Sequence, residues 1–367
     1  MAAYYLASAG WDVLLLEKAQ FPRRKVCGGG LTHRGIMEIP YDITPMIHQT
    51  VHRGFLGFRG QKVCAIQNNL PIAYLIERSS FDDYLRQKAV EKGVSCHQGE
   101  RVTGISQTSD GVTLQTEKSN YTARFAIGAD GVHSLIAKQL GLLPNRTTSL
   151  AMEARLTLPA DRLSSLTDTI TFDFGALSGG YGWIFPKLDH LNVGIFRNWP
   201  GKRATRQQLL RFIHQRSGLE QTQILDIRAY PGPVGGDGGP RHSDRTLLVG
   251  DAANLADPWL GEGISYALAS GRMAAETLIN QTKADTPDLS GYSRQVKQTF
   301  LKPFQFARKM ALLVSLFYYF NVHFLKRSPT LQTMIIDLLR GEISYQDIWR
   351  TMLFHAPRTF YQIIAEK

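Results

Sequence analysis

The chain alternates between short apolar runs and glycine-containing turns along most of its length. Residues 12–17 (DVLLLE) and 246–249 (TLLV) are apolar runs of strand length, and acidic residues lie at or just after their ends. Such runs are typical of buried strands. After the second run, apolar and small residues recur at a spacing of about 3.6 residues, which predicts a helix packed through one face. That face consists of Ile264, Leu268, Gly271, Ala275 and Leu278.

The middle of the chain has a different pattern. Between residues 149 and 230, apolar and polar positions alternate in short stretches, at 151–158, 169–174 and 191–196. Alternation with a period of two is typical of an antiparallel sheet with one face in the core. Residues from about 297 to 367 have helical periodicity instead. The pattern therefore predicts an α/β part, an antiparallel sheet and a C-terminal helical region.

The composition fits a folded protein and excludes several classes. The chain has 367 residues, of which 43% are hydrophobic and 20% charged, and this length favours two or three domains. Its formal net charge of +11 indicates an anionic membrane surface or substrate more than nucleic acid, because no Lys/Arg-rich block is present. Three scattered cysteines argue against a disulfide framework, and ten histidines lack metal-ligand spacing. A reducing compartment and no metal are expected.

The segment from Gly250 to Ile264 carries the clearest chemistry. Asp251 follows the end of the predicted strand, and Gly261 and Gly263 immediately precede the predicted helix. A carboxylate at a strand end can accept hydrogen bonds from the hydroxyls of a polyol, and the free N–H groups of a first helical turn attract an anion. The alternative interpretation is an ordinary strand, turn and helix with a capping aspartate.

The string GDAAN…DP…GEGI in this segment resembles the second flavin-binding motif of FAD-dependent enzymes of the aromatic-hydroxylase and geranylgeranyl-reductase type. The resemblance implies that the cofactor is FAD and that Asp251 binds its ribityl chain. It also implies that Gly261, Gly263 and Ile264 lie under the pyrimidine ring. The dipole of the following helix would there favour the anionic reduced flavin.

Glu17 ends the first predicted strand and suits another part of the same cofactor site. In a dinucleotide-binding βαβ unit, the acid at the end of the second strand binds ribose hydroxyls about 20 residues after a glycine loop. The sequence contains no strand and GxGxxG loop before Glu17, and it begins where the first helix should already be running. We therefore expect a chain truncated at its N-terminus. The alternative is a fold without its central strand, which would expose two strand edges.

A glycine-rich stretch follows Glu17, in residues 21–32 (FPRRKVCGGGLT). Consecutive glycines are tolerated where the backbone must approach a ligand closely. The stretch resembles the (K)xCGGGL segment of the geranylgeranyl reductase family. This implies that Cys27 lies near the flavin or the substrate and that Gly28 and Gly30 contact the cofactor. A flexible loop with an inert cysteine is the alternative.

Two further positions acquire a role through the resemblance. Arg78 begins the string RSSFD, which resembles the RxxFD segment that places an arginine against the cofactor in related flavoproteins. Val102, in a predicted strand, matches a position where the family contacts adenine through backbone atoms. Without the resemblance, Arg78 would be interpreted as a surface arginine.

The predicted sheet contains an aromatic strand, in residues 179–187 (GGYGWIFPK). Tyr181, Trp183 and Phe185 alternate, so their side chains share one face. The strand resembles the YxWxFPK…G string of geranylgeranyl reductases. This implies a substrate cleft in which the aromatic side chains bind a polyene chain and Lys187 meets a phosphate head. A plain aromatic core strand is the alternative.

These segments make the chain similar to the geranylgeranyl reductase family over nearly its whole length. The expected fold class is α/β, with a three-layer, Rossmann-like FAD-binding domain, an antiparallel-sheet substrate domain and a C-terminal helical region. The FAD-binding domain is expected in residues 1–50, 76–147 and 240–290, the substrate domain in 51–75 and 148–239, and the helical region in 291–367.

The resemblance implies that the protein reduces carbon–carbon double bonds of an isoprenoid chain on a diphosphate, a lipid or a pigment. Cys27 and Tyr181 are the candidate catalytic residues, and NADPH or ferredoxin is the expected reductant of the flavin. Two alternatives remain open. One is an FAD-dependent monooxygenase or halogenase on the same fold, and the other is a non-catalytic remnant that binds isoprenoid or membrane.

The C-terminal region contains one very apolar stretch, residues 310–325 (MALLVSLFYYFNVHFL). It is too short to span a bilayer, and basic pairs lie on both sides of it. Such a stretch predicts a buried or interfacial helix. We therefore expect a cytoplasmic monomer with peripheral contact to a cytoplasmic or thylakoid-type membrane.

Overall fold

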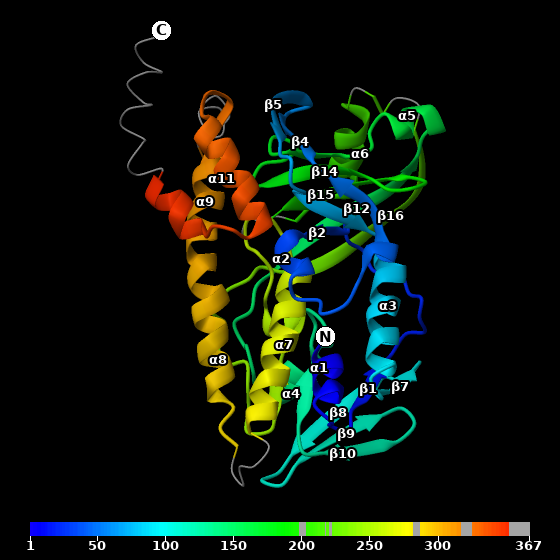
Figure 1. The fold of residues 1–367 in the computed structure, drawn as a ribbon, viewed down its shortest axis with the longest axis vertical. Coiled ribbons are helices and arrows are strands. Elements are labelled where there is room, and N and C mark those ends of the chain that lie inside the picture. The colour runs from blue at the N-terminus through cyan, green and yellow to red at the C-terminus, as the bar shows by residue number, and fades with distance from the viewer. Residues whose placement is uncertain (198–202, 217, 220–221, 282–286, 317–324, 352–367) are drawn as a thin grey trace.

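The computed structural model describes residues 1–197, 203–216, 218–219, 222–281, 287–316 and 325–351. Figure 1 shows an elongated molecule with a broad sheet at one end. Helices α3 (Arg78–Val90) and α7 (Ile264–Asn280) run through its middle, and the C-terminal helices stand beside α7.

Two parallel strand pairs lie in the part predicted to bind FAD. Its other elements, besides α3 and α7, are α1 (Ala2–Ser8), β1 (Leu14–Glu17), β7 (Ser95–Gln98), β11 (Ala126–Gly128), α4 (Leu135–Gln139), β17 (Thr246–Leu248) and η2 (Gly250–Ala253). β1 pairs with β7 and β11 pairs with β17, and no ladder joins the two pairs within the described ranges. Helix α1 packs on α7, and one apolar core includes Leu248, Met273 and Phe304. The parallel pairs and their helices confirm the predicted α/β fold class.

Two three-stranded antiparallel sheets accompany the parallel strands. The first has the order β2-β6-β3 and the second β10-β9-β8. Their elements, with two short helices, are β2 (Gly30–Thr32), α2 (His33–Ile36), η1 (Thr44–Met46), β3 (Ile47–Val51), β6 (Ala73–Ile76), β8 (Val102–Gln107), β9 (Val112–Thr116) and β10 (Asn120–Ala123). Because β2 pairs with β6, the glycine stretch before β2 lies beside the start of α3. The predicted domain boundaries at residues 50 and 75 fall inside β3 and β6, which belong to one sheet.

A seven-stranded sheet forms the other end of the molecule, in the order β16-β12-β15-β14-β13-β4-β5. Its strands are β4 (Arg53–Phe58), β5 (Gln61–Gln67), β12 (Thr148–Thr157), β13 (Thr169–Asp173), β14 (Gly180–Pro186), β15 (Leu191–Arg197) and β16 (Gln223–Pro233). The sheet is mixed, because β13 pairs with β4 in parallel and the other neighbouring strands of the sheet pair in antiparallel fashion. The predicted antiparallel sheet is thus present, with a parallel pair that the prediction did not include. Periodicity reports which face is buried and carries no information on the direction of a neighbouring strand.

The two faces of this sheet pack against different partners. On one face, aliphatic residues such as Val193 contact helix α6 (Arg206–His214), whose first turn has a capping box. The short helix α5 (Ala160–Ser164) contributes to the same core. On the other face, Tyr181, Trp183 and Phe185 form an aromatic cluster. The predicted sharing of one face by these three side chains is confirmed.

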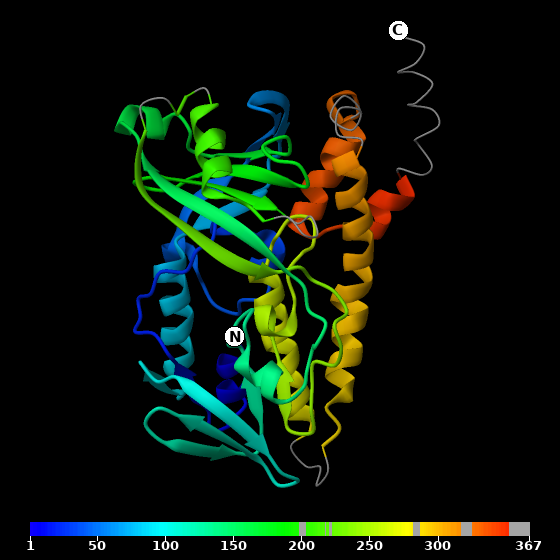
Figure 2. The same cartoon turned by 180° about the vertical axis from the view of Figure 1, so that it is seen from behind.

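The C-terminal helices follow one another along one side of the molecule, as Figure 2 shows from behind. They are α8 (Ser290–Val296), the π-helical turn η3 (Lys297–Leu301), α9 (Lys302–Leu316) and α11 (Pro329–Arg340). Helix α9 covers the predicted apolar helix as far as Leu316, and residues 317–324 and 352–367 lie outside the described residues. None of the helices described is both long enough and apolar enough for a bilayer crossing.

Candidate functional site

Asp251 lies just beyond β17, in a tight turn. Gly250 has a φ of +54°, a conformation that favours glycine and turns the chain into η2. The Asp251 carboxylate accepts a hydrogen bond from the Tyr230 hydroxyl at 3.1 Å and lies 3.5 Å from the Lys25 ammonium group. The side chain keeps 18% exposure, so the carboxylate is held in place and still reachable.

The loop before α7 contacts both Asp251 and the aromatic cluster. Gly261 has a φ of +68°, and a Cβ atom there would lie 3.2 Å from the Tyr181 hydroxyl oxygen. A Cβ on Gly263 would lie 3.5 Å from the Asp251 carboxylate. Gly263 is the N-cap of α7, and no side chain caps the first turn. The first N–H groups of this 17-residue helix are therefore available to an anion or a polar ring.

The Cys27–Gly30 loop lies across the aromatic cluster. The Cys27 amide donates to the Glu153 carboxylate at 2.9 Å. A Cβ on Gly28 would come within 3.0 Å of the Phe185 ring and of the Trp183 indole nitrogen. Gly29 has a φ of +66°, and a Cβ there would collide with the Ile76 carbonyl oxygen. Close backbone approach therefore requires glycine at these positions.

A chain of ionic contacts joins three of the residues singled out in the sequence. Arg78 makes a two-pronged pair with Asp82 at 2.7 and 2.8 Å and also hydrogen-bonds the Cys27 side chain. Burial alone would raise the pKa of Asp82, but Arg78 outweighs burial and the pKa is lowered. Arg23 then bridges Asp82 at 3.3 Å and Glu17 at 3.4 Å. Arg78, Cys27 and Glu17 thus share one network at the end of β1, and Arg78 is not a surface arginine.

Val102 stands apart from this network. Val102 lies in β8, pairs with Thr116 of β9 and is half-buried against the apolar core. Glu17 accepts a hydrogen bond from the Ala19 amide at 3.0 Å, which holds its carboxylate at the end of β1.

The aromatic cluster has polar ends that are all satisfied by the chain. The Tyr181 hydroxyl donates to the Leu260 carbonyl, and the Trp183 indole N–H donates to Asn192 at 2.7 Å. Phe185 and Tyr181 each meet Phe172 edge to face, with ring centroids 5.4 and 5.6 Å apart. The cluster therefore presents fixed rings to the Cys27–Gly30 and Gly261 loops.

Lys187 requires a correction. Its side chain is 1% exposed, and the ammonium group donates to the carbonyls of Ile76 at 2.8 Å and Gly29 at 3.4 Å. Burial lowers its pKa to about 8. Lys187 therefore binds the backbone of the glycine loop and is not available to the phosphate expected from the sequence.

Three contact residues were not singled out by the sequence analysis. Glu153 is 2% exposed and holds the Cys27 amide, and Lys25 and Tyr230 hold Asp251. A glutamate within the alternating run 151–158 was the one local signal for a polar group directed into the site. Lys25 and Tyr230 are 205 residues apart, and nothing local connects them.

These features fit the ribityl and pyrimidine portion of FAD. A partly exposed carboxylate lies at a strand end, and the uncapped start of α7 lies next to it. Glycines at positions 28, 261 and 263 leave room that a Cβ would fill. Asp251 would hold the ribityl hydroxyls, and the α7 N–H groups would hold the pyrimidine edge.

Comparison with known proteins shows what the chain is similar to. Residues 1–169 match the family described as FAD binding domain. The chain is 29% identical to digeranylgeranylglycerophospholipid reductase 1 of Methanopyrus kandleri, over 95% of this chain and 96% of the relative. It is 27% identical to menaquinone reductase of Mycolicibacterium smegmatis, over 95% and 92% of the two chains.

The chain is thus similar to FAD-binding proteins, and reductases of the geranylgeranyl type are among its relatives. Solved structures share its fold. A geranylgeranyl bacteriochlorophyll reductase-like protein of Thermoplasma acidophilum superposes with a TM-score of 0.76, at 23% identity, over 92% of this chain and 88% of that one. The flavin-dependent brominase Bmp2 superposes with a TM-score of 0.73, at 19% identity, over 98% and 96%. Both are similar to this chain in fold. By name, the first is reductase-like and the second is a brominase.

Proposed function

We propose that this flavoprotein reduces carbon–carbon double bonds of an isoprenoid chain. One observation carries the proposal. The aromatic cluster of β14 faces the two glycine loops, at Cys27–Gly30 and Gly261–Gly263, that fit the flavin. A flavin held by these loops would lie against an apolar, water-excluding surface suited to a polyene.

An isolated alkene is a poor hydride acceptor, so its reduction requires a proton as well as a hydride. Bound FAD supplies the hydride when it is reduced. In our proposal the chain's own residues position the reactants. Tyr181, Trp183 and Phe185 line the polyene, and Cys27, held by Arg78 and Glu153, lies at the cofactor edge. The Tyr181 hydroxyl and the Cys27 thiol are the candidate catalytic groups.

The names of the relatives support a prenyl chain in the substrate more than they identify the group that carries it. Two of them name geranylgeranyl groups, on a glycerophospholipid and on a diphosphate, and a third names menaquinone. We infer that the prenyl chain enters the aromatic cleft whichever group carries it. NADPH and ferredoxin are the two proposed reductants, and stopped-flow bleaching of the flavin by each donor distinguishes them.

A flavin-dependent halogenase is the second candidate, because Bmp2 has a similar fold. Against it stands the Cys-Gly-Gly-Gly loop packed on the Tyr-x-Trp-x-Phe strand, which is the feature that resembles reductases. The reduced protein is mixed with substrate and then given a pulse of oxygen. A substrate-dependent oxygenated flavin and a halogenated or hydroxylated product would favour the second candidate over the first.

The deciding experiment is the absorption spectrum of the purified protein, followed by turnover of geranylgeranyl substrates under anaerobic reduction. We expect a flavin spectrum and a product with saturated double bonds. Asp251→Ala should weaken FAD binding about 10- to 100-fold, since hydrogen bonds to a charged group contribute about 1.5–3 kcal/mol. Asp130→Ala is a matched control, because Asp130 caps the Ile136 amide at 3.1 Å. Protein that stays colourless with added FAD would contradict the proposal.

Membrane contact is proposed for α9, where Leu312 and Leu316 are 50% and 60% exposed beside a basic pair. Flotation with anionic lipid vesicles measures it. Leu316→Asp should lower the bound fraction, and equal flotation of both proteins would contradict this contact.

A further inference from the structure

Asp257 organises the loop that leads into α7. Its Oδ1 atom accepts hydrogen bonds from the Trp259 and Leu260 amides, both at 2.8 Å. Its carbonyl accepts from the Gly261 amide at 2.9 Å, and its own amide donates to the Glu262 carbonyl at 2.7 Å. Because these bonds close the loop on Asp257, the orientation of this residue sets the path of the backbone towards α7.

The other carboxylate oxygen of Asp257 is held from outside the loop. It accepts from the Tyr345 hydroxyl at 2.5 Å and from the Tyr266 hydroxyl at 3.3 Å. Tyr345 lies 88 residues further along the chain, beyond α11. Asp257 is 1% exposed and Tyr345 2%, so water competes little for this bond. A hydrogen bond to a buried carboxylate is among the stronger ones in a protein.

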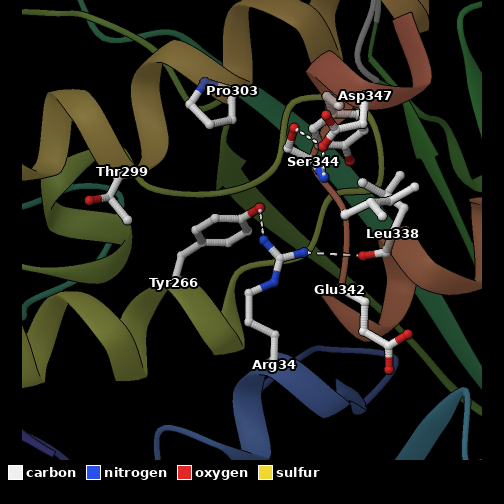
Figure 3. Close-up of a pocket in the computed structure, with 11 residues that line it drawn as sticks. Arg34, Tyr266, Thr299, Pro303, Leu338, Glu342, Ser344 and Asp347 are labelled. Atoms are coloured by element: carbon white, nitrogen blue, oxygen red, sulfur yellow. Dashed lines mark hydrogen bonds between the residues drawn. The ribbon is translucent and has the colours of Figure 1, made fainter. Parts of the chain in front are cut away.

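The Tyr266 hydroxyl is itself held by Arg34 of α2. Figure 3 shows these two side chains meeting at a pocket of about 380 Å³, which is lined by α2, α7 and α11 among other elements. The Arg34 guanidinium donates to the Tyr266 hydroxyl at 3.1 Å and to the Leu338 carbonyl at 3.4 Å. Arg34 thus ties the end of α11 to the start of α7, and both tyrosines that reach Asp257 line the same pocket.

The C-terminal segment, residues 341–351, is shaped to bring Tyr345 to the loop. Helix α11 ends at Gly341, whose φ of +81° turns the chain. The Ser344 amide and hydroxyl donate to the Asp347 carboxylate at 2.9 and 2.6 Å, and residues from 345 onward are helical again. Tyr345 then packs on Trp259 of the loop, with ring centroids 5.9 Å apart, in a core shared with α9 and α11.

The same loop contacts the proposed flavin site further along. Gly261 lies close to Tyr181 of the aromatic cluster, and Gly263 lies close to Asp251. Both glycines follow Asp257 in this one loop. A displacement of Asp257 would therefore move the backbone that is proposed to lie under the flavin pyrimidine.

We propose that Tyr345 is a positioning residue for FAD. It holds Asp257, and through Asp257 the backbone at Gly261–Gly263, in the arrangement that receives the flavin. Docking of the C-terminal segment and binding of FAD therefore favour each other. The inference rests on the cofactor site of the proposed function and does not depend on prenyl reduction.

Dissociation of FAD from the loaded protein tests the proposal, and the fluorescence of the released flavin measures it. Tyr345→Phe removes only the hydroxyl and should weaken FAD binding about 5- to 50-fold, because the lost bond is made to a buried carboxylate. Tyr292→Phe is the matched control. Tyr292 is 0% exposed, and its hydroxyl donates at 2.7 Å to the Leu248 carbonyl, outside this loop. The control should keep the wild-type Kd, and a wild-type Kd in Tyr345→Phe would overturn the proposal.

A double-mutant cycle separates positioning from a general loss of stability. Asp257→Asn keeps the shape of the side chain and removes its charge, so the bond from the Tyr345 hydroxyl is weaker there. In the Asp257→Asn background, Tyr345→Phe should therefore weaken FAD binding by a smaller factor than in the wild type. Equal factors in the two backgrounds would show that Tyr345 does not act through Asp257.

Trypsin cleavage tests the coupling from the other side. Arg340 is 6% exposed, and its guanidinium donates to the Pro71 carbonyl at 2.5 Å and to the Glu342 carboxylate at 2.6 Å. Cleavage between Arg340 and Gly341 therefore reports release of the C-terminal segment. FAD should slow this cleavage about fivefold or more in the wild type and less in Tyr345→Phe, as mass spectrometry of the fragments would show. Cleavage that FAD does not slow in the wild type would contradict the coupling.

The two hypotheses fail in different ways. If the wild type binds FAD and reduces no prenyl double bond, the proposed function fails, and the FAD measurements still decide the role of Tyr345. If Tyr345→Phe binds FAD as the wild type does, the role of Tyr345 is wrong and the proposed function stands. A wild type that binds no FAD would overturn both.

Discussion

The two faces of the seven-stranded sheet have the same strand geometry and opposite chemistry. Against α6, Val193 and Ile195 belong to a core that is mostly aliphatic. Against the cofactor loops, Tyr181 and Trp183 present large rings whose polar atoms are individually satisfied. The first face needs only volume and apolarity. The second places each ring beside a particular glycine, which is a constraint that packing alone does not impose.

The largest effect is expected from a buried ion pair on the α6 face, between Asp173 and Arg216. Asp173 is fully buried and accepts from the Arg59, Gly60 and Gly175 amides and from Arg216. Asp173→Ala leaves the Arg216 guanidinium buried without its partner and should lower the free energy of unfolding by about 3–5 kcal/mol. Denaturant unfolding measures the change.

Because the two faces differ in chemistry, the loss of stability in Asp173→Ala should not disturb the cofactor face. The folded variant should therefore bind as much FAD per molecule as the wild type. Glu117→Ala is the control, because its pair with Arg101 is exposed and should contribute less than about 1 kcal/mol. An Asp173→Ala variant with the same free energy of unfolding as the wild type would show that Asp173 does not stabilise the fold.

A pH-dependent effect is expected on the cofactor face. Burial lowers the pKa of Lys187 from 10.5 to about 8, so between these values the unfolded chain binds more protons than the folded one. Stability should therefore rise with pH across that window, by about 3 kcal/mol from this group, and the contribution is lost as pH falls through 8.

The measurement is the difference in unfolding free energy between the wild type and Lys187→Met as a function of pH, because other titrating groups cancel in it. Parallel curves for the two proteins would mean that Lys187 keeps its ordinary pKa in the folded state.

The smallest effect is expected from the same change, glycine to alanine, made on each face of the sheet. A Cβ on Gly194 would collide with the Trp183 indole, and a Cβ on Gly182 would collide with the Phe212 ring on α6. Each alanine variant should cost about 1–3 kcal/mol through overpacking. Only Gly194→Ala should also change tryptophan fluorescence and prenyl turnover. Equal functional losses in both variants would show that the two faces do not differ in role.

Local signals were sufficient for the elements of the site. The glycine turn after β17, the start of α7 and the alternation in β14 depend on neighbouring residues, so the sequence predicted them correctly. Helix α3 shows the limit of such signals. It begins at Arg78 without a side-chain cap, so no capping residue marks its start.

Side-chain partners that are distant in sequence could not be predicted. A lysine after an aromatic strand suggested a phosphate ligand, but the Lys187 ammonium meets carbonyls that are 111 and 158 residues away. Glu153 reaches the Cys27 amide across 126 residues, and no periodicity encodes that contact. The parallel pairing of β13 with β4 was missed for the same reason.

The sequence by itself determined which residues form the strands, the glycine turns and the aromatic stripe, because these depend on backbone freedom and side-chain period within a few residues. Tertiary structure alone decided which charges meet. It placed Tyr345 on Asp257 across 88 residues and enclosed both in a low-dielectric interior. Burial and charge pairing determine where protons reside, and both arise only when distant segments pack together.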